Sequence, residues 1–203
     1  MPVPPSTTAT TTAPTGPAGP DTAWRVDNLT GADVLADPAP WTDAYETVYA
    51  DVLHLPDHST PPFAERLAFS ANRPGFRLTA CYVGGELAGF AYGYTLPPTT
   101  GWWDGFVPLP GVDAEDVTAE RPGRTFAMCE ALVHVPFRGS GIVERSMPFF
   151  LSGREEERAA GLVAETNTHA RDIFLRNGWQ HVGDLAPHPG WRGHHCLLMP
   201  LNG

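Results

Sequence analysis

Two apolar segments separated by Gly84-Gly85 constrain the fold more than any other feature of the sequence. Residues 76–83 and 86–96 are rich in the aromatic and aliphatic side chains that favour strands. Paired glycines between two such runs readily adopt the positive φ that a two-residue hairpin turn requires. We therefore expect an antiparallel β-hairpin over residues 76–96.

The rest of the chain alternates between strand and helix patterns. Further strands are predicted over residues 24–29, 125–135, 162–166, 179–185 and 194–198. Helices are predicted over residues 43–55 with Thr42 as N-cap, over 63–70 before the breaker at 73–75, within 141–160, and over 168–177 with Gly178 at the C-terminal cap. This order indicates a mixed α/β fold.

Length and composition favour one domain. Residues 1–20 are mostly Pro, Thr, Ala, Ser and Gly, without a basic residue or an apolar run, so we expect a disordered tail and no secretory signal. Residues 21–203 then form a single domain that can bury a core without metal or disulfides. The cysteines (Cys81, Cys129 and Cys196) are far apart in apolar, strand-like settings, which suits core packing in a reduced cytoplasm, and no metal site is expected.

The charge balance argues against nucleic acid as a partner. The formal net charge is −10, and all 13 basic residues are arginines without a basic run. No apolar stretch is long enough for a membrane span, so a soluble, cytoplasmic protein is expected. The acidic surface would attract a cationic acceptor, but it serves solubility equally well.

Residues 97–124 are predicted to form a long loop, because they contain several prolines and glycines and the pair Trp102-Trp103. Two interpretations remain open at this point. The loop covers a pocket, or the tryptophans merely pack on the body of the domain.

The segment from Val133 to Val143 carries the clearest chemical signal. A strand leads into the turn Arg138-Gly-Ser-Gly141, which opens a helix. Glycines allow an anion to approach the backbone closely, and the unpaired N–H groups at a helix start point toward it. Alone, a Gly-x-Gly turn more often marks a plain turn; its position between strand and helix favours a phosphate site.

Together with a second motif about 30 residues later, this segment resembles the GNAT superfamily of N-acetyltransferases. The first motif resembles the family's Arg/Gln-x-x-Gly-x-Gly/Ala loop. The second resembles its Asn-x-x-Ala-x-x-x-Tyr-x-x-x-Gly-Phe helix, matched by Asn167, Ala170, Gly178 and Trp179. The resemblance covers residues 22–200. It implies a mostly antiparallel, twisted sheet of about seven strands, splayed after the fourth, with about four flanking helices.

The resemblance also implies roles for particular residues. Acetyl-CoA, or another acyl-pantetheine, would be bound by Leu132, Val133, Val135, Arg138, Gly139, Ser140, Gly141, Ile142, Val143, Asn167 and Phe174. Glu130 is expected to be the general base, since it is the sole carboxylate on its strand; a structural ion pair or hydrogen bond is the alternative. His134, about 13 Å farther along the strand, is the second candidate for the general base, and a surface histidine is the alternative. The acceptor would lie among Tyr45, Tyr49, Tyr92, Tyr94, Trp102 and Trp103.

Three positions depart from the family pattern. Val143 places a branched side chain where a small residue would let a phosphate approach. Pro148 implies that the helix either kinks or begins near Ser146, which would turn its dipole away from the loop. Phe174 replaces a tyrosine that in many relatives is thought to protonate the leaving thiolate, and core packing is its default role.

The leading hypothesis is therefore an N-acyltransferase that acts on an amine of a small molecule, and we expect it to transfer an acetyl group. The Ala- and Pro-rich composition, in which every basic residue is an arginine, resembles that of high-GC bacteria, where such enzymes often modify antibiotics or biosynthetic intermediates. Two alternatives stay open: transfer from an acyl carrier protein, and a degenerate binding or sequestering protein. The sequence also leaves a homodimer open.

Overall fold

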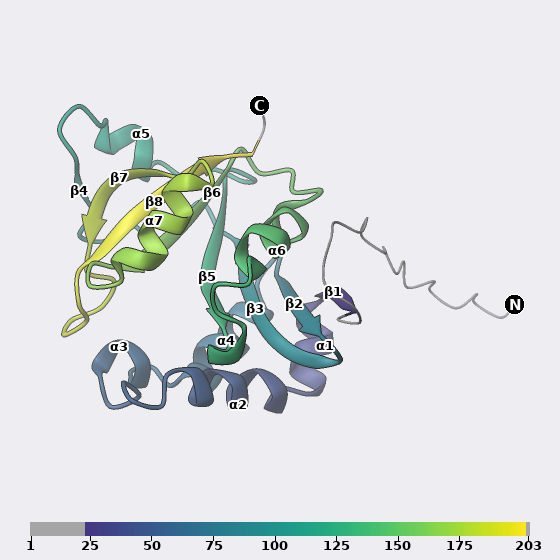
Figure 1. Ribbon diagram of the computed structural model, residues 1–203. Helices are drawn as coiled ribbons and strands as arrows, with labels where there is room; N and C mark the ends of the chain where they lie inside the picture. The colour runs from purple at the N-terminus through teal and green to yellow at the C-terminus, as the bar shows by residue number, and fades with distance from the viewer. Residues whose placement is uncertain (1–22, 202–203) are drawn as a thin grey trace, which may run out of the picture.

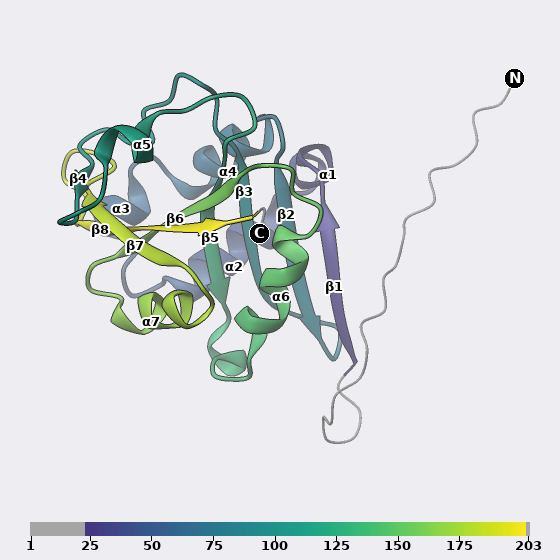
Figure 2. The ribbon, with the colours of Figure 1, turned by 90° about the horizontal axis from the view of Figure 1, so that it is seen from above.

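The computed structural model describes residues 23–201, which form one open sheet with helices on both faces (Figures 1 and 2). The expected tail over residues 1–20 lies outside the described residues. The strands of this part of the chain are β1 (Trp24–Leu29), β2 (Arg77–Val83), β3 (Glu86–Thr95), β4 (Val107–Pro108), β5 (Thr125–Val133), β6 (Arg158–Ala164), β7 (Gln180–Leu185) and β8 (His194–Pro200). Its α-helices are α1 (Gly31–Ala36), α2 (Ala39–Val48), α3 (Pro56–Ser59), α4 (Phe63–Ala71), α5 (Ala114–Thr118), α6 (Ile142–Leu151) and α7 (Thr168–Arg176).

The strands follow the order β1-β2-β3-β5-β6-β8-β7-β4, and neighbouring strands run antiparallel except β5 and β6. The predicted mixed, mostly antiparallel fold is therefore confirmed. The predicted hairpin is confirmed as β2 and β3, with Gly84 and Gly85 at φ 61° and 88°.

The sheet divides the apolar core into layers. Because side chains alternate along a strand, Leu78 and Ala80 of β2 face a cluster with Trp41 of α2 and Leu67 of α4, while Cys81 faces Ile142 of α6. A second large cluster packs α6 and α7 against the opposite face. The two helix groups thus lie on different faces of the sheet (Figure 2).

The two halves of the sheet separate after a short parallel contact. Strands β5 and β6 pair over Thr125–Met128 and Arg158–Gly161, whereas both strands continue beyond this point without pairing to each other. The splay predicted after the fourth long strand is therefore confirmed. It leaves one edge of β5 unpaired from Cys129 to Val133.

A β-bulge at Cys129 changes the faces of β5. Tyr92 pairs with Glu130 but Gly93 pairs with Met128, so Cys129 is the extra residue. Met128 packs toward α6 and α7, while Cys129 and Leu132 pack toward α2 and α4. The bulge thus presents Glu130 on the α2 side of the sheet.

Several predicted boundaries are wrong. The first long helix covers residues 39–48 rather than 43–55: it begins after Pro38, and Thr42 lies inside it, with its hydroxyl donating to Ala39 O at 3.0 Å. Strand 125–135 ends at Val133, because Pro136 lacks an N–H and the chain enters a 3-10 turn over residues 135–137. Val135 is therefore not a strand residue, and its side chain is exposed.

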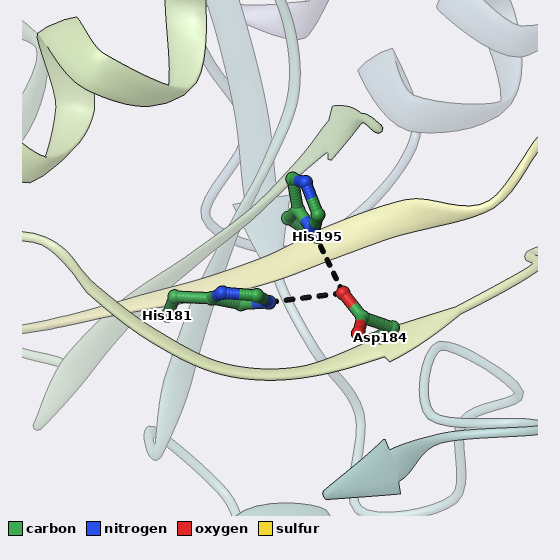
Figure 3. Close-up of side chains that lie close together, drawn as sticks. All are labelled: His181, Asp184 and His195. Carbon is green, nitrogen blue, oxygen red and sulfur yellow. Dashed lines mark hydrogen bonds and ion pairs between the residues drawn. The ribbon is translucent and has the colours of Figure 1, made fainter. Parts of the chain in front are cut away.

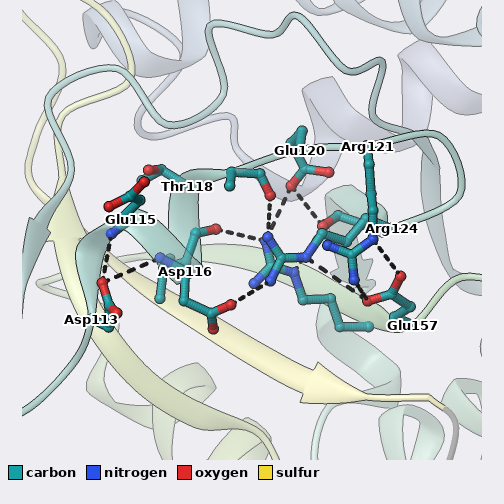
Figure 4. Close-up of polar contacts among 12 residues, drawn as sticks. Asp113, Glu115, Asp116, Thr118, Glu120, Arg121, Arg124 and Glu157 are labelled. Atoms are coloured by element: carbon teal, nitrogen blue, oxygen red, sulfur yellow. Dashed lines mark hydrogen bonds and ion pairs between the residues drawn. The ribbon is translucent and has the colours of Figure 1, made fainter.

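Residues 97–124 are more ordered than the predicted loop, since they contain β4 and α5. Trp103 is buried in a cluster with Leu96 and Val117, and Trp102 is half-buried against it. Ion pairs fix the end of this segment to β6 and the residue before it: Glu120 pairs with Arg158, and Arg121 pairs with Glu157. Within the segment, Arg124 pairs with Asp116 (Figure 4). The tryptophans therefore pack on the body of the domain.

Candidate active site

The turn between β5 and α6 is shaped by two glycines in the left-handed region. Gly139 and Gly141 have φ of 74° and 78°, a conformation that other residues adopt at a cost. The Ser140 hydroxyl donates to Phe137 O at 2.6 Å, and Arg138 Nε donates to Val133 O at 3.3 Å. These bonds hold the turn while its remaining N–H groups face outward.

Five main-chain N–H groups of this turn have no acceptor in the part of the chain that the structure describes. They belong to Gly139, Gly141, Ile142, Val143 and Glu144. Four of them form the cap and first turn of α6, where the helix dipole is positive. The arrangement is suited to an anion.

Pro148 does not displace the helix start. Helix α6 begins at Ile142, with Gly141 as N-cap, and contains Pro148 as an exposed residue. The sequence predicted that this proline either kinks the helix or moves its start to near Ser146, and the second prediction is wrong. The dipole therefore remains directed at the glycine turn.

The open edge of β5 adds main-chain groups beside the turn. The N–H of His134 donates to Ala88 O of β3 at 2.9 Å. Because successive residues of a strand direct their N–H and C=O groups to alternate sides, the backbone of Val133 points away from β3, into the gap beside β6. An extended ligand could pair with the strand there.

Glu130 lies on the opposite face, at the end of α2. Its carboxylate accepts hydrogen bonds from the Tyr49 hydroxyl at 2.9 Å and from the Ala131 N–H at 3.2 Å. Burial raises the pKa of Glu130, while the charge of Arg66 and the Tyr49 hydrogen bond oppose this shift. A carboxylate with a raised pKa accepts a proton more readily than one in water, as a general base must.

Sequence models of protein families do not match the chain, and neither do the sequences of curated proteins. Solved structures do match its fold. The ribosomal-protein-S18-alanine N-acetyltransferase from Escherichia coli superimposes with a TM-score of 0.58 at 11% identity, over 89% of this chain and 96% of that chain. The IAA acetyltransferase from Bacillus cereus gives 0.54 at 11% identity, over 88% and 99%. An aminoglycoside acetyltransferase in complex with coenzyme A and kanamycin gives 0.56 at 12% identity, over 88% and 95%.

The chain has the GNAT fold. The resemblance inferred from the two short motifs is thus confirmed at the level of the fold, although the sequences share little. The free N–H groups lie at the start of α6, whereas Glu130 lies beside Tyr49 at the end of α2, and the unpaired part of β5 lies between them.

The structure divides the predicted acceptor residues into two groups. Tyr45, Tyr49 and Tyr92 lie in or against the α2–α4 core beside Glu130. Tyr94, Trp102 and Trp103 pack instead against or within the cluster of the 97–124 segment. A hollow of about 370 Å³ lies under that segment, but it is lined by other residues, among them Asp116, Arg124 and Arg158.

A polar network that the sequence did not reveal lies next to Tyr45. The Tyr45 hydroxyl contacts His58 Nδ1 at 2.7 Å and accepts from Arg66 at 2.7 Å. Arg192, from the β7–β8 connection, donates to Asp57 of α3 at 2.6 Å. The network joins segments more than 130 residues apart, and no local pattern in the sequence indicates it.

The other predicted site residues differ in their surroundings. Asn167 caps α7 through its side-chain oxygen, which accepts from the Ala170 N–H at 3.1 Å. Phe174 is buried edge-on against Trp179, with ring centroids 5.1 Å apart, and Leu132 and Ile142 are core residues. His134 Nε2 is buried without a partner in the described chain, and burial lowers the pKa of this ring.

Proposed function

We propose that this protein is an acyl-CoA-dependent N-acyltransferase that acetylates an amine of a small molecule. The observation that carries the proposal is the set of free N–H groups at the start of α6, next to the unpaired edge of β5. These features suit a ligand that combines an anion with an extended, hydrogen-bonding arm. A diphosphate joined to pantetheine has both.

The turn can accommodate such a donor. The N–H groups from Gly139 to Glu144 would bind the diphosphate, and the exposed Arg138 could add its charge. Val143 packs against the α6–α7 core, which supports a side chain directed away from the anion. When bound, the donor supplies an activated acyl group as a thioester.

Glu130 is the proposed general base. In the transfer, the amine nitrogen forms a bond to the acyl carbon, the carbon–sulfur bond breaks, and the proton of the amine passes to the Glu130 carboxylate. The thiolate can leave without a protein acid and take its proton from water, since thiols have a pKa near 8.5. Phe174 therefore does not prevent the reaction.

The acceptor is proposed to lie on the Glu130 side, between α2–α4 and the β7–β8 connection. Tyr49, His58 and Trp191 supply ring faces there, and the carboxylate of Glu130 would attract a cationic amine. The kanamycin complex of a structural neighbour supports an acceptor of this class. The proposal also includes a role in antibiotic modification and a homodimer, and it specifies the class of the acceptor rather than one compound.

Donor binding is the first test. Acetyl-CoA titrated calorimetrically into the protein should bind in a 1:1 complex, as inferred from the one turn. Gly141→Val should weaken binding, because a branched residue at φ 78° distorts the turn. Gly153→Val is the matched control: this glycine has φ 63° at the other end of α6, with similar strain but no role in the turn. Equal losses in both variants would refute the anion site.

Turnover is the second test. With a library of amines, Glu130→Gln should lower kcat by about 10²- to 10⁴-fold while acetyl-CoA binding is unchanged. Glu86→Gln, at the exposed start of β3, serves as control. Binding of a carrier-protein thioester instead of acetyl-CoA, or donor binding without turnover, would replace the proposal by one of the two alternatives.

A further inference from the structure

Strands β7 and β8 bring together a second group of chemically competent side chains. His181 and Asp184 lie on β7, and His195 lies on β8 (Figure 3). His181 Nε2 is 2.9 Å and His195 Nδ1 is 2.7 Å from the same oxygen, Asp184 Oδ1. One donor atom from each residue lies within 4.8 Å of the others.

We propose that His181, Asp184 and His195 bind a divalent transition-metal ion, with Zn²⁺ as the ion that the ligands suit best. Two imidazoles and one carboxylate form a donor set typical of open zinc sites, in which a water molecule completes a tetrahedron. The carboxylate also neutralises part of the ion's charge. This site is separate from the glycine turn and from Glu130, and it does not depend on the proposed function.

Small movements would bring the three donor atoms to the spacing of a bound site, since all of them lie within 4.8 Å of one another. Around a tetrahedral ion with ligand distances of about 2.0–2.2 Å, donor atoms lie roughly 3.3–3.6 Å apart. The two contacts to Asp184 are shorter, so its carboxylate must withdraw by about half an ångström. Its side chain is 50% exposed, which leaves room for this movement and for water.

The backbone holds the ligands in place. His181 and His195 lie on paired strands, with side chains 22% and 17% exposed, and a bulge at residues 181–183 brings Asp184 opposite His195. Ligands on strands of one sheet need little ordering when the ion binds.

The proposal is tested by titrating Zn²⁺ into the full-length, untagged chain after treatment with a chelator. We expect one ion per chain, and a Zn²⁺-dependent rise in Tm, because an ion that joins β7 to β8 stabilises the folded state. Co²⁺ should give the visible absorption of a tetrahedral site. Neither readout requires acyl transfer, so failure of one proposal is distinguishable from failure of the other.

The variants His181→Gln and His195→Gln should lower zinc affinity by about tenfold or more and abolish the rise in Tm. Asp184→Asn keeps the side-chain shape but removes the carboxylate. It should also lower zinc affinity, and it provides a second test if the histidine variants do not fold. His169→Gln, at an exposed histidine of α7, is the control and should bind as the wild type does. No saturable binding by the wild type, or equal loss in the control variant, would overturn the site.

Discussion

Replacement of Arg158 by Met should destabilise the protein more than any other loss of a charge considered above. Its side chain is 10% exposed, and its guanidinium pairs at 3.1 Å with Glu120, whose side chain is completely buried. The same carboxylate oxygen accepts from Trp103 Nε1 and Thr125 Oγ1. Arg158 also donates to Val117 O at 2.6 Å, so it joins the 97–124 segment to β6.

The expected loss in the free energy of unfolding is about 3–5 kcal/mol. Methionine retains most of the apolar stem of Arg158 but leaves the Glu120 carboxylate buried without its cation, and breaking one side of a buried pair has this magnitude. For a domain of this size, with an m-value of about 2 kcal/mol/M, the urea midpoint should fall by about 2 M. The fall in Tm should be roughly 6–20 °C.

Two further variants separate charge burial from lost packing. Arg121→Met breaks the pair with Glu157, in which the two side chains are 56% and 45% exposed. It should lower the free energy of unfolding by less than about 1 kcal/mol. In Arg158→Met/Glu120→Gln the buried charge is absent, so most of the stability should return. If Arg158→Met were as mild as Arg121→Met, or the double variant as unstable as the single one, the reasoning would be refuted.

Three other predictions concern the candidate site and the first helix. Burial raises the pKa of Glu130 in the folded state. The stability contributed by its protonated form is therefore present below the unfolded pKa and is lost as pH rises through the folded pKa. Glu130→Gln should increase the free energy of unfolding, measured in urea, at pH 7 but not near pH 4. Tyr49→Phe removes a hydrogen bond that lowers the pKa of Glu130, so the acidic limb of the kcat profile should move to higher pH; an unshifted limb would contradict Glu130 as base. Thr30→Ala removes the capping box of α1 and should lower the free energy of unfolding by about 1 kcal/mol, with Thr42→Ala, inside α2, as comparison.

No helix in the described part of the chain is long and apolar enough to cross a membrane. Several arginines of the described chain are paired with carboxylates inside the fold, among them Arg154, Arg158 and Arg192.

The sequence by itself determined the features that depend on neighbouring residues. The Gly84-Gly85 turn fixed the central hairpin, and the apolar spacing of residues 63–70 predicted α4. The turn at Arg138–Gly141 indicated free N–H groups because glycine conformation and a helix start are local properties. The capping pattern Thr30-x-x-Asp33 also marks α1 and could have revealed it.

Only the tertiary structure decided how distant segments meet. The bulge at Cys129 depends on the pairing of β5 with β3, and it directs Glu130 toward Tyr49, which is 81 residues away. The contact between Arg192 and Asp57, and the group formed by His181, Asp184 and His195, likewise depend on the register of strands and connections. Such contacts depend on how burial and strand pairing are satisfied over the whole chain, so the spacing of residues in the sequence does not predict them.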